Sequence, residues 1–374
     1  MAGAIGEVNL MASGGGMQKD YIISVKSNLA KILKKLRSDL EMLTEMLARR
    51  YNLGEENFPM LREDIRDFLR QMQSMGMIIE TLKPPIDAPA LCVSIAGLRI
   101  DFHGPAQLFS GYFDDFCMSE SDTDADQEIE FRTVPPASNA YGKVLLRNDD
   151  MTIFENADRY VVLFPQMANI HQVHMTLDGS YVQFYCTPET SDLARENIFH
   201  AVRLFFLFIA QQHGKFAIHS ASILYKEKAW LFSGHSGMGK STHTSMWHEF
   251  LQTPYLNGDL NLLGIENDRI MVYGIPWCGT SEIYTTVNYE LGGIILLGRD
   301  PEKDFLKELT PSERVIRVMQ RMISPSWKER CFSRNLDFAG DIAEHVPVLY
   351  LLCTKNPSAV YTIQKEIDRL EDLR

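Results

Sequence analysis

The sequence lacks any apolar run long enough to cross a membrane. Its longest run, Leu204–Ala210, has seven residues, whereas a membrane-spanning helix needs about 20. The first 17 residues also lack the basic start and the continuous apolar core of a secretory signal. We therefore expect a cytoplasmic protein with no membrane partner.

Cysteine and positive charge are both scarce. The six cysteines form no C-x-x-C pair and show no spacing that suits a zinc site, so we expect free thiols in a reducing compartment. The 37 Lys+Arg are outnumbered by 49 Asp+Glu, which gives a net charge of −12. Because an acidic surface does not attract a polyphosphate backbone, nucleic acid is not an expected partner. The 45% share of apolar residues excludes disorder along most of the chain.

The length predicts two or three domains, at roughly 100–200 residues per domain, and the residue patterns favour three segments. These are residues 1–83, 89–192 and 193–374. We expect a multidomain protein, with an α+β winged helix first, a β-rich segment next and an α/β domain last.

The first segment is slightly basic within an acidic chain, since residues 17–83 carry 12 Lys+Arg and 10 Asp+Glu. An apolar stripe predicts a helix from Leu40 with basic residues in its last turn. A second helix is expected from Pro59, a favoured first position, to the stop at Gly76. A short strand over residues 77–79 should follow.

The second segment is rich in predicted strands and contains one strongly acidic stretch. Eight acids and no base lie between residues 114 and 130, and like charges at this density favour a solvated loop over a metal site. Apolar and alternating residues predict strands at Leu91–Ile95, Leu98–Phe102, Lys143–Arg147, Tyr160–Phe164, His171–Leu177 and Tyr181–Cys186.

The third segment alternates helices and strands. Residues 193–212 predict a buried helix, because its second half is apolar almost all round. Residues 310–313 form a capping box with proline at the first helical position, and a last helix begins near residue 356. Strands are expected at residues 216–224, 229–232, 262–265, 270–273, 293–297 and 348–353.

Residues 234–241 carry the strongest chemical signal, because they fit the phosphate-binding loop (P-loop) pattern G-x-x-x-x-G-K-[ST]. In such a loop, glycines let backbone N–H groups face phosphate oxygens, the lysine adds a positive charge and the hydroxyl ligates Mg²⁺. A strand before the loop and a helix after it supply the required context. The residues expected to bind ATP are Gly234, His235, Ser236, Gly237, Met238, Gly239, Lys240, Ser241 and Thr242.

A magnesium site also needs a carboxylate from a neighbouring strand end. Asp259 follows Lys240 by 19 residues and precedes an apolar strand. A lone aspartate after a turn is commonly a helix or turn cap, but the P-loop upstream favours Asp259 as a Mg²⁺ ligand beside Ser241, or as the base.

The segment from His219 to Asp259 resembles HPr kinase/phosphorylase and its relatives. His219 lies 15 positions before Gly234, as a strand histidine does in that family, and the loop matches the family pattern G-[DH]-S-G-x-G-K-S. The resemblance implies a PEP-carboxykinase-like P-loop fold, with catalytic roles for Lys240, Asp259 and His219. The family carries an acidic pair that holds Mg²⁺ and moves a proton; Asp259 matches its second member, whereas Gly258 stands in place of the first.

The first 80 residues resemble the PqqD-like peptide-recognition domains, which are small winged-helix units. The matching features are Tyr21–Ser24 before the first helix, an Arg-Arg-Tyr helix end and a closing Gly-Met-Ile at residues 76–78. The resemblance implies that residues 1–83 bind the leader of a ribosomally made precursor peptide as an added strand. A generic winged helix fits the same pattern. Val272–Gly279 is also similar to kinase-like proteins found beside peptide-modification genes.

Other residues near the motif carry weaker signals. Glu282 could complete the metal shell, although a surface acid is the more ordinary reading. Arg299 follows a predicted strand and could contact phosphate, but a solvated arginine is the default. His235 and His243 flank the phosphate site and could reach a nucleotide; no chemistry is assigned to them.

Three functions remain open. The first is an ATP- and Mg²⁺-dependent kinase that phosphorylates a Ser or Thr hydroxyl of a peptide docked by residues 1–83. Gly258 motivates the second, a non-catalytic nucleotide-binding adaptor or chaperone for a precursor peptide. A large gain in transfer on restoring an aspartate at position 258 would identify an impaired enzyme. The third is a kinase for a small metabolite such as free serine. The peptide, the phosphorylated residue, phosphorolysis and a homo-oligomeric state stay open.

Overall fold

The computed structural model describes residues 8–10, 21–23, 40–74, 82, 84, 87–119, 124–136 and 140–372. The chain divides into two compact units. One comprises residues 1–81 with 137–139, and the other comprises residues 82–136 with 140–374. The domain boundaries expected from the sequence, at residues 83 and 192, stay predictions.

The first unit contains a short strand pair and two helices. β1 (Val8–Leu10) and β2 (Tyr21–Ile23) pair antiparallel. α2 (Leu40–Tyr51), the 3-10 helix η1 (Glu55–Asn57) and α3 (Phe58–Ser74) follow, so both predicted helices are confirmed. The expected strand at residues 77–79 lies outside the described residues, and the winged-helix prediction is therefore untested.

The second unit begins with an eight-stranded mixed sheet in the order β3-β4-β5-β10-β9-β8-β7-β6. Its pairs are antiparallel except β4–β5 and β5–β10, which are parallel. The strands and short helices are β3 (Leu91–Ile95), β4 (Leu98–His103), η2 (Ala106–Leu108), η3 (Asp114–Phe116), β5 (Gln127–Arg132), β6 (Lys143–Arg147), β7 (Thr152–Glu155), β8 (Arg159–Leu163), β9 (Ile170–Thr176) and β10 (Tyr181–Cys186).

The acidic stretch is only partly a loop. The prediction of a loop over residues 114–130 is wrong at its two ends, because η3 and the start of β5 lie there. Glu130 on β5 accepts hydrogen bonds from Arg132 Nε (3.0 Å), Gln183 Nε2 (2.9 Å) and the Tyr181 hydroxyl. Partners on the same and the neighbouring strand thus satisfy a carboxylate that a local charge count places in water.

A second sheet follows, in the order β12-β11-β14-β15-β16-β18-β17, with β13 beside β11. β12 also pairs with β16, which closes five of the strands into a ring. β16 runs parallel to β12 on one side and to β18 on the other. The strands are β11 (Lys215–Tyr225), β12 (Lys228–Ser233), β13 (Tyr255–Asn257), β14 (Leu260–Glu266), β15 (Arg269–Tyr273), β16 (Tyr289–Arg299), β17 (Phe305–Lys307) and β18 (Val348–Cys353).

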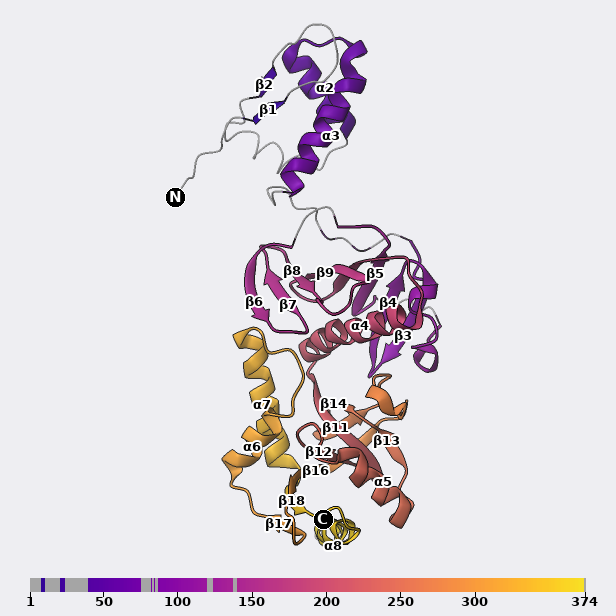
Figure 1. Cartoon of the computed structure of the whole chain (residues 1–374), viewed down its shortest axis with the longest axis vertical. Coiled ribbons are helices and arrows are strands. Elements are labelled where there is room, and N and C mark those ends of the chain that lie inside the picture. Colours follow the sequence, from indigo (N-terminus) through magenta and orange to yellow (C-terminus); the bar gives the residue numbers. More distant parts are fainter. Residues whose placement is uncertain are drawn as a thin grey trace. The chain divides into compact units, whose positions relative to one another are not determined.

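Four helices cover this second sheet, as Figure 1 shows. They are α5 (Lys240–Leu251), α6 (Pro311–Met319), α7 (Glu329–His345) and α8 (Ser358–Glu371), and the 3-10 helix η4 (Gly279–Ser281) lies between β15 and β16. Alternate residues of β12 serve two cores: Leu231 packs with α6 and α7, whereas Trp230 and Phe232 pack with α5 and α8. The alternation explains why the predicted strand at residues 229–232 is apolar throughout.

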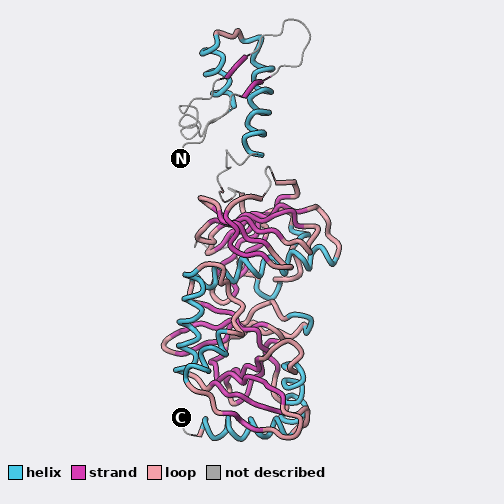
Figure 2. The backbone as a smooth tube through the Cα atoms, turned by 60° about the vertical axis from the view of Figure 1, so that its left-hand side comes forward, coloured by secondary structure: helices cyan, strands magenta, loops and turns pink. Residues whose placement is uncertain are grey.

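The helix α4 (Asp192–Gln212) lies between the two sheets (Figures 1 and 2). Its Phe205 and Phe206 belong to the same core as residues of β10 and of β14, so the predicted buried helix is confirmed. Ser191 caps its start, and Gly214 follows its end with a φ of 70°. In the described part of the chain, no helix is long and apolar enough to cross a membrane. All six cysteines are free thiols.

The helix α7 was not predicted, because its buried face is interrupted by a polar residue. Asn335 is 1% exposed; its Nδ2 donates to the carbonyls of Ser324 and Pro325, and its Oδ1 accepts from Gln211 Nε2 at 2.7 Å. An apolar stripe that contains a buried asparagine gives a weak periodic signal.

Candidate active site

The predicted P-loop segment, residues 234–239, lies between the end of β12 and the start of α5, which confirms the predicted strand before it and helix after it; that the segment binds phosphate stays a prediction. Gly237 and Gly239 adopt φ values of 72° and 101°, a backbone region that favours glycine. These two turns bring the chain directly into α5, whose first residue is Lys240. Ser241 and Thr242 are exposed in the first turn of that helix, so the free N–H groups of the helix start face an open site.

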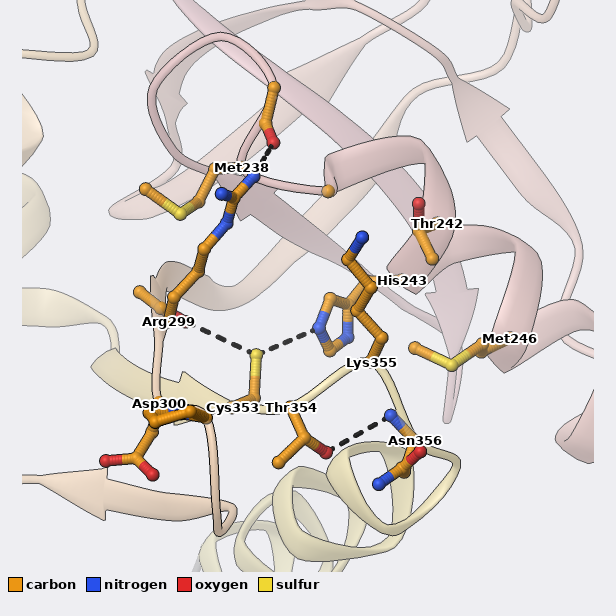
Figure 3. Close-up of a pocket in the computed structure, with 14 residues that line it drawn as sticks. Met238, Thr242, His243, Met246, Arg299, Asp300, Cys353, Thr354, Lys355 and Asn356 are labelled. Carbon is orange, nitrogen blue, oxygen red and sulfur yellow. Dashed lines mark hydrogen bonds between the residues drawn. The ribbon is translucent and has the colours of Figure 1, made fainter.

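Three parallel strands place distant residues at one edge of the sheet. The P-loop follows β12, Arg299 ends β16, and residues 354–356 follow β18. Because carboxyl ends of parallel strands meet at the same edge, these segments enclose a cavity of about 540 Å³ (Figure 3). The lining residues are Gly237, Met238, Gly239, Thr242, His243, Met246, Gly298, Arg299, Asp300, Pro301, Cys353, Thr354, Lys355 and Asn356.

The floor of this cavity is neutral. His243 is buried on α5, and its Nε2 lies 3.2 Å from Cys353 Sγ. Burial lowers the pKa of His243 to about 4 and raises the pKa of Cys353 to about 11, so both groups are uncharged near neutral pH. Lys355, which follows β18, also lines the cavity (Figure 3). The cavity therefore combines an apolar, sulfur-containing floor with charged groups at its rim.

Asp259 and His219, predicted as catalytic, lie in contact. His219 Nε2 is 3.0 Å from Asp259 Oδ1. The register explains the contact, because His219 on β11 pairs with Leu260, the residue after Asp259, at the start of β14. Ser233, the last residue before the P-loop, also donates a hydrogen bond to the His219 carbonyl (2.7 Å). The structure thus brings His219 and Asp259 together and ties His219 to the strand that leads into the loop.

The charges around Asp259 keep it ionised. The hydrogen bond from His219 is the main cause that lowers the pKa of Asp259; burial opposes it, and the charges of His219, Lys240 and Arg203 lower it further. Burial lowers the pKa of Lys240, and the charge of Asp259 opposes that effect. The P-loop lysine and the Asp259 carboxylate therefore act on one another.

The turn before Asp259 is fixed by Asn257. Its Oδ1 accepts hydrogen bonds from the backbone N–H groups of Asp259 and Leu260, both at 3.1 Å. Its Nδ2 lies within 3.5 Å of the carbonyls of Ile275 and Trp277. Asn257 is 4% exposed, so it holds the backbone of Asp259 against the loop after β15.

The place beside Gly258 is already occupied. A Cβ atom built on Gly258 would lie 1.9 Å from Ser281 Oγ and 2.5 Å from Ser281 Cβ. A side chain introduced at position 258 must therefore displace Ser281. Gly279 also packs closely on Asp259, since a Cβ atom built on Gly279 would lie 2.8 Å from the Asp259 Cβ.

The residues present fit a Mg²⁺ ion held together with nucleotide phosphates. Magnesium in such sites takes one or two carboxylates and keeps waters and phosphate oxygens as its other ligands. Asp259 supplies one carboxylate, and its Oδ2 has no hydrogen-bond partner among the described residues. Ser241 supplies the exposed hydroxyl. Within the described ranges, no cluster of three or more His, Cys, Asp or Glu side chains forms a metal site without phosphates.

Two arginines contact the P-loop. Arg299 Nη2 donates to the Gly237 carbonyl (2.5 Å). Arg321 lies against His235, with its Nη2 2.9 Å from His235 Nε2. The carbonyl of Arg321 also accepts the N–H of His219 (2.9 Å). Arg299 was a weak candidate in the sequence, whereas Arg321 was missed because it lies 80 residues beyond the loop without a local motif.

Three further predicted residues are exposed on the surface. Glu282 is exposed, has a φ of 55°, and follows η4, and its role as a metal ligand stays a prediction. His235 and Ser236 are exposed in the loop. Sequence reasoning also missed Asn257 as a positioning residue and Arg203 of α4, whose charge acts on Asp259.

Comparisons with known proteins find no relative by sequence and a distant likeness among solved structures. No family model matches the chain, and no curated protein matches it. Among solved structures, the HPr(Ser) kinase/phosphatase from Coxiella burnetii matches with 11% identity over 42% of this chain and 93% of its own, at a TM-score of 0.27.

Proposed function

We propose that this protein is a phosphotransferase that moves the terminal phosphoryl group of ATP to a hydroxyl group. The observation that carries the proposal is the contact of Asp259 with His219, beside Lys240 of the P-loop. Phosphoryl transfer needs a cation for the phosphates, a carboxylate for the proton and a fixed geometry. These three requirements meet in residues drawn from β11, α5 and the turn before β14.

Each residue of the site has a distinct task. Lys240 and the loop N–H groups bind the β- and γ-phosphates. Asp259, ionised and oriented by His219, accepts the proton of the attacking hydroxyl. Ser241 and Asp259 would hold Mg²⁺ together with the phosphates, and the ion would supply positive charge to the phosphate oxygens. The 540 Å³ cavity beyond Gly239 and Thr242 is large enough for the nucleoside.

The acceptor of the proposed reaction is a Ser or Thr hydroxyl of a precursor peptide. The resemblance of residues 1–83 to peptide-recognition domains supports this assignment. In the described part of these residues, the β1–β2 pair offers strands to which an extended leader could add.

The test is incubation of the full chain with ATP, Mg²⁺ and candidate precursor peptides, read by mass spectrometry. We expect the peptide to gain one phosphoryl group and Lys240→Ala to abolish the gain. Lys365→Ala is the matched control, because Lys365 is exposed on α8 and does not line the cavity. Transfer that persists in Lys240→Ala would refute the assigned site.

A nucleotide-binding adaptor is the second candidate. It is favoured by the single carboxylate at the site and by Ser281, which fills the space beside Gly258. This function predicts that ATP and the leader bind, that no transfer occurs, and that ATP changes the affinity for the leader.

A further inference from the structure

His243 on α5 lies at the floor of the cavity beside the P-loop and has one ring nitrogen without a partner. The residue is 3% exposed and lines the cavity together with Thr242 and Met246 of the same helix. Its Nε2 lies 3.2 Å from Cys353 Sγ (Figure 3), whereas its Nδ1 is withdrawn from water and has no hydrogen-bond partner among the described residues. A buried polar atom left unpaired is costly unless a ligand supplies its partner.

The contacts of Cys353 determine which nitrogen of the imidazole carries the proton. The Cys353 thiol donates to the Gly298 carbonyl, which lies 3.4 Å from Sγ. Since the single S–H proton is used there, the sulfur accepts the N–H of His243 Nε2. The His243 ring is buried and neutral, and a neutral imidazole has one N–H and one lone pair. Nδ1 is therefore an acceptor, and its missing partner is an N–H or O–H donor.

The two elements that flank the P-loop hold the His243 ring in this orientation. On one side, the ring stacks on buried Phe232 of β12, with centroids 5.9 Å apart and planes 13° apart. On the other, the backbone N–H of His243 donates to the carbonyl of Gly239 in the loop (2.9 Å). The position of Nδ1 is therefore fixed relative to the residues proposed to bind phosphate.

The rest of the cavity fits a flat aromatic group joined to an anion. The thioethers of Met238 and Met246 line it, and methionine sulfur makes favourable contacts with aromatic rings and adapts to their shape. Arg299 and Lys355 place positive charge on the same cavity, next to Gly239 of the P-loop. A nucleotide combines these properties, because it has anionic phosphates and a flat base with N–H donors on its edge.

We propose that His243 selects the base of the nucleotide, because its Nδ1 accepts a hydrogen bond from the 6-amino group of adenine. The inference rests on the proposed function and deepens it, since it assigns the residue that distinguishes ATP from GTP. Guanine carries a carbonyl oxygen at the same position, and two acceptors that face each other repel. The phosphates stay on Lys240 and the loop N–H groups, so His243 adds affinity and selectivity without taking part in the transfer.

The test measures equilibrium binding of three nucleotides to the full chain in the presence of Mg²⁺. They are ADP, GDP and purine riboside 5′-diphosphate, an analogue of ADP that lacks the 6-amino group. We expect the wild type to bind ADP about tenfold more tightly than the analogue and about 10²-fold more tightly than GDP. His243→Met removes the acceptor and keeps an apolar side chain in the cavity, so this variant should bind ADP and the analogue within about twofold of each other. Thermal unfolding checks that the variant folds, and the wild-type comparison needs no substitution.

His248→Met is the matched control, because it makes the same substitution on the same helix. His248 is exposed, its Nδ1 lies 2.9 Å from the Thr253 carbonyl, and it does not line the cavity, so the preference for ADP over the analogue should stay at the wild-type value. Equal losses for all three nucleotides in His243→Met would show a structural role and overturn the proposal. A wild type that binds ADP and the analogue equally well would overturn it too and leave the proposed function standing. A wild type that binds none of the three nucleotides would refute the proposed function as well.

Discussion

An aspartate introduced at position 258 should damage the site instead of completing it. The Cβ atom would lie 1.9 Å from Ser281 Oγ and 2.5 Å from Ser281 Cβ, so Ser281 must move. The move is costly because Ser281 Oγ donates to the Cys278 carbonyl (2.6 Å) and accepts the N–H of Ile283 (3.2 Å). The N–H of Gly258 also donates to the Ile283 carbonyl (3.0 Å). This hydrogen bond holds the backbone at Gly258 against the segment that contains Ser281.

The expected magnitude follows from these contacts. Overpacking of a fitted site costs about 1–3 kcal/mol, and we expect Gly258→Ala to lower the free energy of unfolding by about 2 kcal/mol. Gly258→Asp should cost more, because it adds a second carboxylate beside Asp259. Displacing Ser281 also moves Gly279, which packs on Asp259. A misplacement of about 1 Å there should slow phosphoryl transfer about 10²-fold.

The assay is a double-mutant cycle read by urea unfolding and by the rate of transfer. Ser281→Gly removes the side chain that Gly258→Ala would strike, so the double variant should be more stable than the sum of the two changes predicts, by about 1 kcal/mol or more. Additive effects would show that the two positions do not touch. A Gly258→Asp variant with wild-type stability and faster transfer would refute the steric reasoning.

Further changes test the proton acceptor, the turn and the cavity floor. Asp259→Asn should lower the transfer rate about 10²–10⁴-fold with ATP affinity kept, and His219→Gln should lower it less; steady-state kinetics measure both. Asn257→Ala leaves two backbone N–H groups unpaired and should cost about 1–3 kcal/mol in urea unfolding. The folded pKa of His243 is about 4 against 6.5, so the unfolded chain binds more protons between these values. Stability therefore falls as the pH drops from 6.5 to 4, by up to about 3 kcal/mol. His243→Gln should reduce this dependence, and His171→Gln, an exposed control, should not.

The strand, loop and helix around residues 234–241 could be predicted from the sequence because the P-loop pattern is local. Eight consecutive residues set the glycine turns, the lysine and the start of α5, and no distant contact is needed to recognise them. The pairing of His219 with Asp259 is different in kind. Spacing alone suggested both residues, but their contact depends on the antiparallel register of β11 and β14, which the sequence does not state.

The residues that were missed act across long sequence separations. Arg203 lies 56 positions before Asp259, and Ser281 fills the space beside Gly258 from 23 positions away. A pattern of neighbouring residues in the sequence cannot indicate either of these two spatial relationships. The same reason explains β5, where Glu130 sits in a central strand because Tyr181 and Gln183 of β10 bind its carboxylate. Charge counted along the chain describes solvated segments well and paired side chains poorly.

The charge of the whole chain and the charge of the site have opposite signs. A net charge of −12 opposes the approach of ATP, which is itself a polyanion, but salt screens this repulsion beyond about 8 Å at physiological ionic strength. The charges of Lys240 and Arg203 act on a single carboxylate, Asp259, and the charge of Arg321 acts on Lys240. The surplus of positive charge is therefore local and matched to one bound anion. An acidic composition is thus compatible with the binding of a phosphate group. The net charge disfavours large anionic partners at long range, whereas the charges next to the site determine whether a small anion binds there.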